Sequence, residues 1–129
     1  MLLVRDVMRI GVPVCRDTDR CGAVAETLAR QPGGAEAVVV LDEEGMACGW
    51  IAWQELAGQP AGQSVGGVMD EDIPTIPPDI PAEVAAQILR DRRQEYAFLM
   101  HDWPGEPRPS AMISLAAVER RLAEANPIT

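Results

Sequence analysis

The hydrophobic and polar positions of this chain form the same pattern twice, about sixty residues apart. Residues 4–8 open the first copy and residues 64–69 open the second, and both openings end in Val-Met. An apolar residue and a proline follow in each copy, at Val12-Pro13 and at Ile73-Pro74. A short extended stretch then leads to a turn that contains an aspartate. A pattern that recurs in the same order predicts two structural units of one kind.

A helix is expected after the turn in each copy, over residues 22–30 and 81–90, where apolar residues recur at helical spacing. In the second helix Pro81 suits the first helical position, and Asp79 is placed to cap the helix. The residues of this helix that we expect to face the core are Val84, Ala85, Ile88 and Leu89.

Two strands and another helix complete each copy. Residues 37–41 and 96–100 are continuous apolar runs, which are typical of buried strands. The remaining elements, in chain order, are a turn at 42–45, a return strand at 48–52, a helix at 53–57, a proline-rich turn at 103–109, a return strand at 111–114 and a helix at 115–124.

Each copy is therefore predicted to have the order strand, helix, strand, strand, helix. The predicted boundaries are 1–58 for the first repeat, 59–63 for a polar linker that does not pack, and 64–129 for the second repeat with its C-terminal helix. A half of this length buries only about 60% of its surface and is marginal alone. We expect one compact α+β unit in which two βαββα repeats pack with pseudo-twofold symmetry.

Composition and charge narrow the function classes. Apolar residues make up 47% of the 129 positions, yet no apolar run approaches the ~20 residues of a membrane span. The first residues lack the pattern of a signal peptide, so a cytoplasmic location is expected. Twenty acidic residues face eleven basic ones, for a net charge of −9, and this surface repels nucleic-acid phosphates and anionic lipids. We expect neither a nucleic-acid nor a membrane partner.

Metal binding and catalysis are not expected. Cys15, Cys21 and Cys48 are odd in number and lie in or beside apolar stretches, which favours reduced thiols. A zinc site with His101 is the alternative, but no Cys-x-x-Cys pair supports it. The acidic clusters at 42–44 and 70–72 are interpreted as solvated turns rather than cation sites. One histidine, no lysine and no nucleophile motif argue against an enzyme.

Two further groups of side chains offer alternatives. Arg90, Arg92 and Arg93 could receive an anionic ligand, although cations at the C-terminal end of a helix are the simpler interpretation. Trp50, Trp53 and Trp103 could stack a base, although packing in the core or at a dimer interface is favoured for Trp50 and Trp53, which flank a return strand.

The order of the elements, the Val-Met openings, the aspartate turns and the glycine-led return strand resemble CBS domains in tandem, often called a Bateman module. The resemblance runs from about Val4 to Val118. It implies a non-catalytic regulatory or sensor module that binds an adenine nucleotide or S-adenosylmethionine in clefts between the repeats. It also implies a homodimer. No cofactor is required.

The ligand motif of the family is a glycine, two apolar residues, Thr or Ser, two variable residues and then Asp. In the first copy the hydroxyl is lost at Ala52 and the Asp becomes Glu55. In the second copy Ser114 keeps the hydroxyl, but Ala117 replaces the carboxylate. Ser114 is as well placed to cap the following helix as to touch a ligand. The residues that the resemblance implies for ligand binding are Ile73, Pro74, Thr75, Ser114, Ala52 and Glu55.

Two hypotheses remain open from the sequence. One is a sensor that binds an adenosyl ligand weakly, with its better pocket in the second copy. The other is a dimerisation scaffold whose pockets are degenerate. In both we expect a C2 homodimer with helices 22–30 and 115–124 at its interface, because apolar residues of the latter exceed the needs of one small core. These residues are Leu115, Val118 and Leu122. The sequence does not identify an effector protein.

Overall fold

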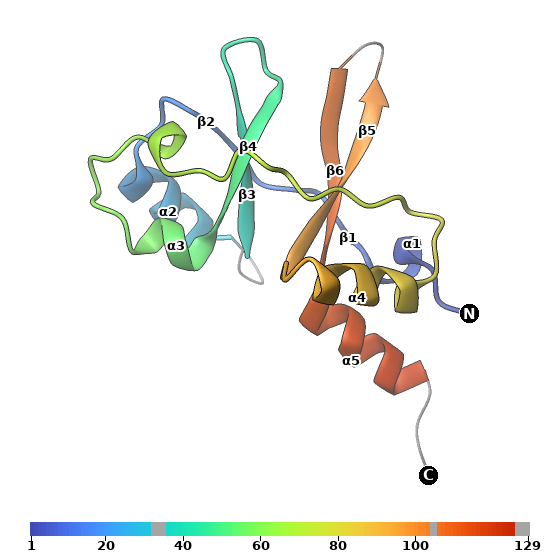
Figure 1. Ribbon diagram of the computed structural model, residues 1–129. Coiled ribbons are helices and arrows are strands. Elements are labelled where there is room, and N and C mark those ends of the chain that lie inside the picture. The colour runs from blue at the N-terminus through green and yellow to red at the C-terminus, as the bar shows by residue number, and fades with distance from the viewer. Residues whose placement is uncertain (32–35, 104–105, 126–129) are drawn as a thin grey trace. The chain divides into compact units, whose positions relative to one another are not determined.

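Two three-stranded sheets with their helices organise the chain (Figure 1). The computed structural model describes residues 1–31, 36–103 and 106–125. The chain forms two compact units that are discontinuous in sequence. Unit 1 consists of 1–11, 74–101 and 109–129, and unit 2 of 12–73 and 102–108. Among the described residues, no helix has the length and apolar character that crossing a membrane would require.

Unit 2 has strand order β2-β3-β4, with β2 parallel to β3 and β3 antiparallel to β4. Two helices, α2 and α3, pack together, and a short 3-10 helix, η1, follows. The elements are β2 Val14–Arg16, α2 Cys21–Ala29, β3 Ala37–Leu41, β4 Ala47–Ala52, α3 Trp53–Ala57 and η1 Val65–Gly67. The core of this unit consists of Cys15, Cys21, Val24, Leu28, Val38, Val40, Ile51, Leu56 and Val65.

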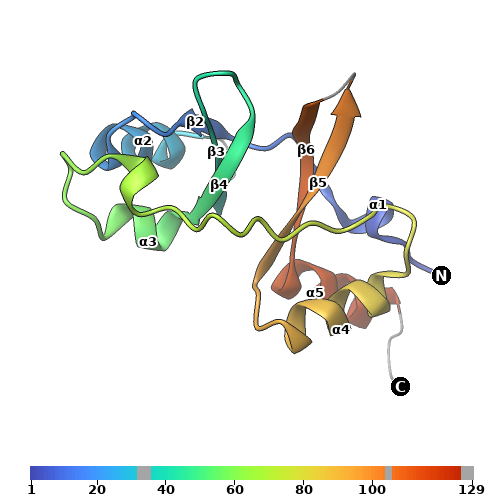
Figure 2. The same ribbon diagram turned by 45° about the horizontal axis from the view of Figure 1, so that its top comes forward.

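Unit 1 also contains a three-stranded sheet, with strand order β1-β6-β5 and with β1 antiparallel to β6, and its helices α4 and α5 lie side by side in both views (Figure 1 and Figure 2). Its elements are α1 Val4–Val7, β1 Arg9–Ile10, α4 Ala82–Asp91, β5 Tyr96–Trp103, β6 Glu106–Ser114 and α5 Leu115–Ala125. Its core consists of Val4, Ile76, Ala82, Ala85, Ala86, Leu89, Ala97, Leu99, Ala111, Ile113 and Val118.

The opening segment of each repeat lies in the unit that contains the first helix of the other repeat. In unit 1 the amide of Val4 donates to Ile80 O at 3.0 Å, and in unit 2 the amide of Val65 donates to Asp19 O at 2.9 Å. Val4 and Val65 are 61 positions apart in the sequence, and so are Asp19 and Ile80. The same backbone bond is therefore made twice, with the two repeats in exchanged roles. This exchange explains why the units are discontinuous.

Main-chain carbonyls just before the two opening segments accept hydrogen bonds from the first amides of α4 and α2. Ala82 N, at the start of α4, donates to Leu2 O at 2.8 Å, and Cys21 N, at the start of α2, donates to Gln63 O at 2.8 Å. Neither helix has a side-chain cap. Amides that begin a helix need an external acceptor, and here a distant backbone segment supplies it.

The prediction for the start of α4 was therefore wrong by one residue. Pro81 lies at the N-cap rather than at the first helical position, and Asp79 makes no side-chain cap. Val84 was expected in the core but is 46% exposed. The buried face is formed by Ala82, Ala85, Ala86 and Leu89. At about 100° per residue, Val84 points away from that face.

The first-repeat hairpin agrees with the sequence prediction. Strand β3 and helix α3 have the predicted bounds, and the turn between β3 and β4 is made by 42–45. Asp42 Oδ1 accepts the amides of Glu44 at 2.9 Å and Met46 at 3.0 Å, and Gly45 has a φ of +82°. An aspartate that accepts nearby amides and a glycine with positive φ are what a tight turn requires.

The second hairpin differs from its prediction. The proline-rich segment 103–109 was expected to be a turn, yet β5 continues to Trp103 and β6 begins at Glu106. Pro107 and Pro109 are two positions apart in β6, just before the residues Ala111 and Met112 that pair with β1. The prolines therefore do not mark the ends of the two strands.

The segment 59–63, expected to join the repeats without packing, packs on the start of α2. Gly22 N donates to Ala61 O at 3.0 Å, and the guanidinium of Arg20 donates to Gly62 O at 3.1 Å. A Cβ on Gly22 would lie 2.7 Å from the Cβ of Ala61. This segment thus contributes to unit 2, and a glycine is needed where it approaches the helix.

This contact predicts the effect of two matched glycine substitutions. Gly22→Ala should lower the free energy of unfolding by about 1–3 kcal/mol, because the clash outweighs the gain in helix propensity. Gly62→Ala should change it little, since no heavy atom lies within 4 Å of the place that its new methyl group would occupy. Urea unfolding of both variants measures the difference. Equal stability of the two would contradict the packing of 59–63 on α2.

Candidate ligand-binding site

Ser114 ends β6 and caps α5. Its side chain is 9% exposed, and its Oγ accepts the amide of Ala117 at 3.2 Å. The next amide, Leu115 N, donates to Glu95 O at 2.8 Å, which fixes the junction of strand and helix. The capping role left open by the sequence is therefore present. Because the hydroxyl accepts in this contact, its proton stays available to a further acceptor.

Pro74 and Thr75 run along the outer edge of β5. Phe98 N donates to Pro74 O at 2.8 Å, and Ile76 N donates to Phe98 O at 3.1 Å. Thr75 pairs with Phe98 in a parallel bridge and is exposed, whereas Pro74 is buried. Since β6 pairs with the opposite edge of β5, that strand lies between Thr75 and Ser114. The two hydroxyls belong to one unit but do not adjoin.

Ile73, Ala52 and Glu55 belong to unit 2. Ile73 is half-buried and is the last residue of the long segment of that unit. Ala52 precedes α3 as its N-cap and makes no side-chain bond, and Glu55 is exposed on α3. Trp53 N donates to Glu36 O at 2.9 Å, the counterpart of the bond from Leu115 to Glu95. The two motifs therefore occupy equivalent junctions, but only the second carries a hydroxyl.

The tryptophans of the first repeat pack in unit 2. Trp50 is 8% exposed, and its indole nitrogen donates to Asp72 O at 3.0 Å. Trp53 is half-buried against the core of the unit. Its indole nitrogen is buried and has no hydrogen-bond partner in the described part of the chain. Packing, rather than a stacking platform, is the role seen for Trp50. The side chain of Trp103 lies outside the described residues.

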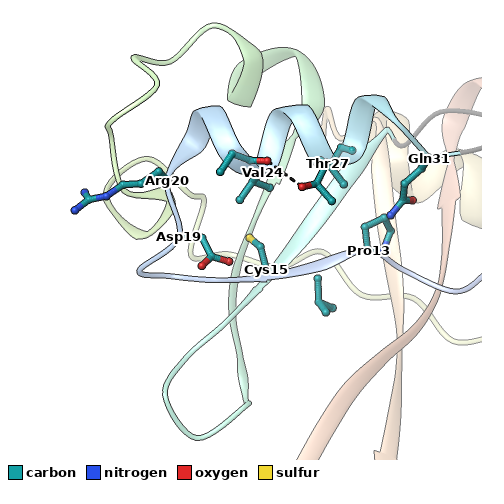
Figure 3. Close-up of a pocket in the computed structure, with 10 residues that line it drawn as sticks. Pro13, Cys15, Asp19, Arg20, Val24, Thr27 and Gln31 are labelled. Carbon is teal, nitrogen blue, oxygen red and sulfur yellow. Dashed lines mark hydrogen bonds between the residues drawn. The ribbon is translucent and has the colours of Figure 1, made fainter.

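A groove between β2 and α2 is the feature that the sequence did not reveal (Figure 3). It has a volume of about 280 Å³ and lies wholly in unit 2. Its apolar wall is formed by Pro13, Val14, Cys15, Val24 and Leu28. Asp19 and Arg20 lie at one end of the groove and Gln31 at the other. The groove forms where β2 and α2 pack against each other, although only four residues separate them in the sequence.

The arginine cluster at the end of α4 is partly engaged. Arg90 forms an ion pair with Glu119 of α5 at 3.1 Å and also donates to Gln87. Arg93 adopts a φ of 54°, which ends the helix in the left-handed conformation. Arg90 therefore links the two helices of unit 1.

The three cysteines are free thiols, and two of them are buried. Burial, with Asp19 next in importance, raises the pKa of Cys15 to about 12. Burial also raises the pKa of Cys21 and of Cys48. Thiols in this state are poor nucleophiles and poor metal ligands. Within the described residues no three His, Cys, Asp or Glu side chains gather in a way that would hold a metal ion. The side chain of His101 lies outside those residues.

Comparisons with known proteins give one family and one fold. The model of the CBS domain matches residues 65–102. The chain matches no curated protein sequence. Among solved structures it is similar to the CBS-domain pair of protein MJ0100, solved in complex with 5′-methylthioadenosine and S-adenosyl-L-methionine. That match has 15% identity and a TM-score of 0.81, and it covers 97% of this chain and 98% of the other.

Two further structures show the same fold. A CBS-domain-containing protein from Agrobacterium tumefaciens matches with 24% identity and a TM-score of 0.72, covering 92% of this chain and 91% of its own. The cytosolic domain of the Mg²⁺ channel MgtE, solved in complex with ATP, matches with 18% identity and a TM-score of 0.73 over 90% of this chain. The chain spans about half the length of two magnesium-transporter structures that it matches, 48% and 47%.

The raised pKa of Cys15 predicts a stability change at alkaline pH. The neutral thiol is favoured in the folded state, so its contribution is fully present below pH 9 and is lost as pH rises from about 9 toward 12. The maximum slope for one group is about 1.4 kcal/mol per pH unit. Urea unfolding at several pH values should show a shallower alkaline decline for Cys15→Ala than for the wild type. Parallel declines would contradict the burial of this thiol.

Proposed function

Because the chain has the fold of a tandem CBS-domain pair, and its second repeat matches the CBS domain by sequence, we propose that it is a non-catalytic regulatory module that binds an adenosyl compound weakly. The candidate ligands are AMP, ATP and S-adenosylmethionine. The observation that carries the proposal is the similarity to a CBS pair solved with two adenosyl ligands. No catalytic role is proposed for any residue, and no cofactor is required.

The second repeat supplies the residues that we assign to the ligand. Thr75 is exposed at the edge of β5, and its neighbour Pro74 is buried, so the backbone there is held in place. Ser114 caps α5 as an acceptor and can still donate its proton to a ribose or phosphate oxygen. In the first repeat Ala52 offers no such group, and we assign only a minor part to Glu55 and to Ile73 of the second repeat.

Weak binding follows from the absent carboxylate. A carboxylate at position 117 would accept ribose hydroxyls in charge-assisted hydrogen bonds. Its loss removes ~1.5–3 kcal/mol, which is about ten- to a hundredfold in affinity. We therefore expect occupancy by AMP or ATP only at roughly millimolar concentration.

A degenerate dimerisation scaffold is the second candidate. The observation that favours it is the loss of a motif residue at Ala52 and at Ala117, together with the capping bond that already occupies Ser114. Both candidates include a homodimer and a cytoplasmic location, which the free thiols support. The effector protein stays unidentified.

The ligand proposal is tested by restoring the carboxylate. Ala117→Asp should tighten binding of AMP, ATP or S-adenosylmethionine about tenfold or more, and Ser114→Ala should weaken it. Isothermal calorimetry is the suitable measurement, because an aspartate in the first turn of α5 also stabilises the helix without any ligand.

Ala116→Asp is the matched control for this experiment. It adds the same charge to the same turn of α5, one position away from the motif and on an exposed residue. Affinity should change at position 117 and not at position 116. If neither substitution alters the affinity for any adenosyl ligand, the scaffold is the better description.

The homodimer is tested by mass. Of the apolar residues first assigned to the interface, Val118 is buried in the core of unit 1, and Leu115 and Leu122 are partly buried against that core. Val84, exposed on α4, is a better candidate for the contact. Light scattering should give about twice 13.9 kDa, and Val84→Glu should lower the mass. A monomer mass that persists at high concentration argues against the dimer.

A further inference from the structure

The net charge of the chain lies entirely in unit 2. Unit 1 contains seven acidic residues and seven arginines, whereas unit 2 contains thirteen acidic residues and four arginines. The difference of nine in unit 2 equals the whole net charge of −9. A surface with this excess attracts cationic partners and raises their rate of association.

The outer edge of β2 offers hydrogen-bonding groups in the same unit. Val39 N donates to Pro13 O at 3.0 Å, and Asp17 N donates to Leu41 O at 3.0 Å, so these alternate positions face β3. Val14 and Arg16 therefore face outward. The amide of Arg16 donates to Asp19 Oδ2 at 2.9 Å, and its carbonyl accepts from Asp19 N. In the described part of the chain only Val14 keeps its amide and carbonyl free on this edge, and it is 50% exposed.

The groove described above lies directly beside this edge and is anionic at one end. Asp19 and Cys15 lie together beneath the start of α2 (Figure 3). Arg20, which lines the same end of the groove, is directed away from them and donates to Gly62 O. Asp19 and Asp17 both raise the pKa of Cys15, which indicates a negative potential in the groove. An apolar wall, a free strand edge and an unneutralised carboxylate thus meet in one place.

We propose that this groove docks an extended basic segment of a partner protein. The segment pairs with the free amide and carbonyl of Val14, as in strand addition at a sheet edge. One apolar side chain of the segment fills the space against Val24 and Leu28. Its lysines or arginines face Asp19 and the surrounding carboxylates of unit 2. This inference is independent of the adenosyl ligand proposed above.

Binding of a fluorescently labelled peptide of alternating lysine and valine to the full chain tests the proposal by anisotropy. Asp19→Asn keeps the acceptor for Arg16 N but removes the charge, and it should weaken binding about two- to fivefold. Ala23→Leu, on an exposed position of α2 that lines the groove, should weaken it by about tenfold by filling the space. Added salt should weaken binding to the wild type.

Matched variants separate the groove from the general charge of unit 2. Glu26→Gln removes a charge from the exposed side of α2, where Glu26 pairs with Arg30, and it should leave binding nearly unchanged. Equal weakening by Asp19→Asn and Glu26→Gln means diffuse attraction and overturns the proposal. Equal binding of a glutamate-valine peptide would also overturn it. So would evidence that two copies of the chain dimerise through this groove and thereby prevent peptide binding.

Discussion

The exchange of opening segments is the constraint on which the rest of this structure depends. Helices α2 and α4 begin without side-chain caps, and their first amides are satisfied by Gln63 O and Leu2 O. An unsatisfied buried amide costs about 1–3 kcal/mol, which is a large part of the stability of a unit this small. Each repeat therefore needs the opening segment of the other. The two units are therefore not two consecutive domains, since each contains segments of both repeats.

Most elements were predictable because they depend on local pattern. The apolar run 37–41, the turn at Asp42 and Gly45 and the helix at 53–57 follow from side-chain periodicity and turn chemistry within a few residues. The errors share a different cause. Asp79 is not a cap because a carbonyl about eighty residues away accepts the first amide of α4, and Pro107 and Pro109 lie within β6 rather than in a turn. Non-local partners decide such positions, and a single sequence does not name them.

The structural positions of the motif residues were predictable in part for the same reason. The motif positions Ala52 and Ser114 do lie at equivalent strand–helix junctions, as the two matching bonds to Glu36 O and Glu95 O demonstrate. The groove beside β2 and the free edge at Val14 arise only when strand and helix pack. The charge difference between the units is not visible when the sequence is divided into two consecutive halves. Unit 1 is assembled from three separate segments, so each half contains residues of both units.

The charge distribution also bears on which ligand each unit can hold. A polyphosphate near unit 2 meets an excess of nine carboxylates, whereas unit 1 is neutral as a whole. Exposed charges act over a Debye length of about 8 Å at physiological salt, so this repulsion is strongest for a ligand bound at unit 2 itself. It works against ATP more than against AMP, and it does not oppose the cationic sulfonium of S-adenosylmethionine. The charges therefore favour the proposed nucleotide site in unit 1, which contains Thr75 and Ser114, and the proposed basic partner at unit 2. Added salt should therefore favour nucleotide binding, because it screens the repulsion by unit 2. It should weaken binding of the basic partner, because it screens their attraction.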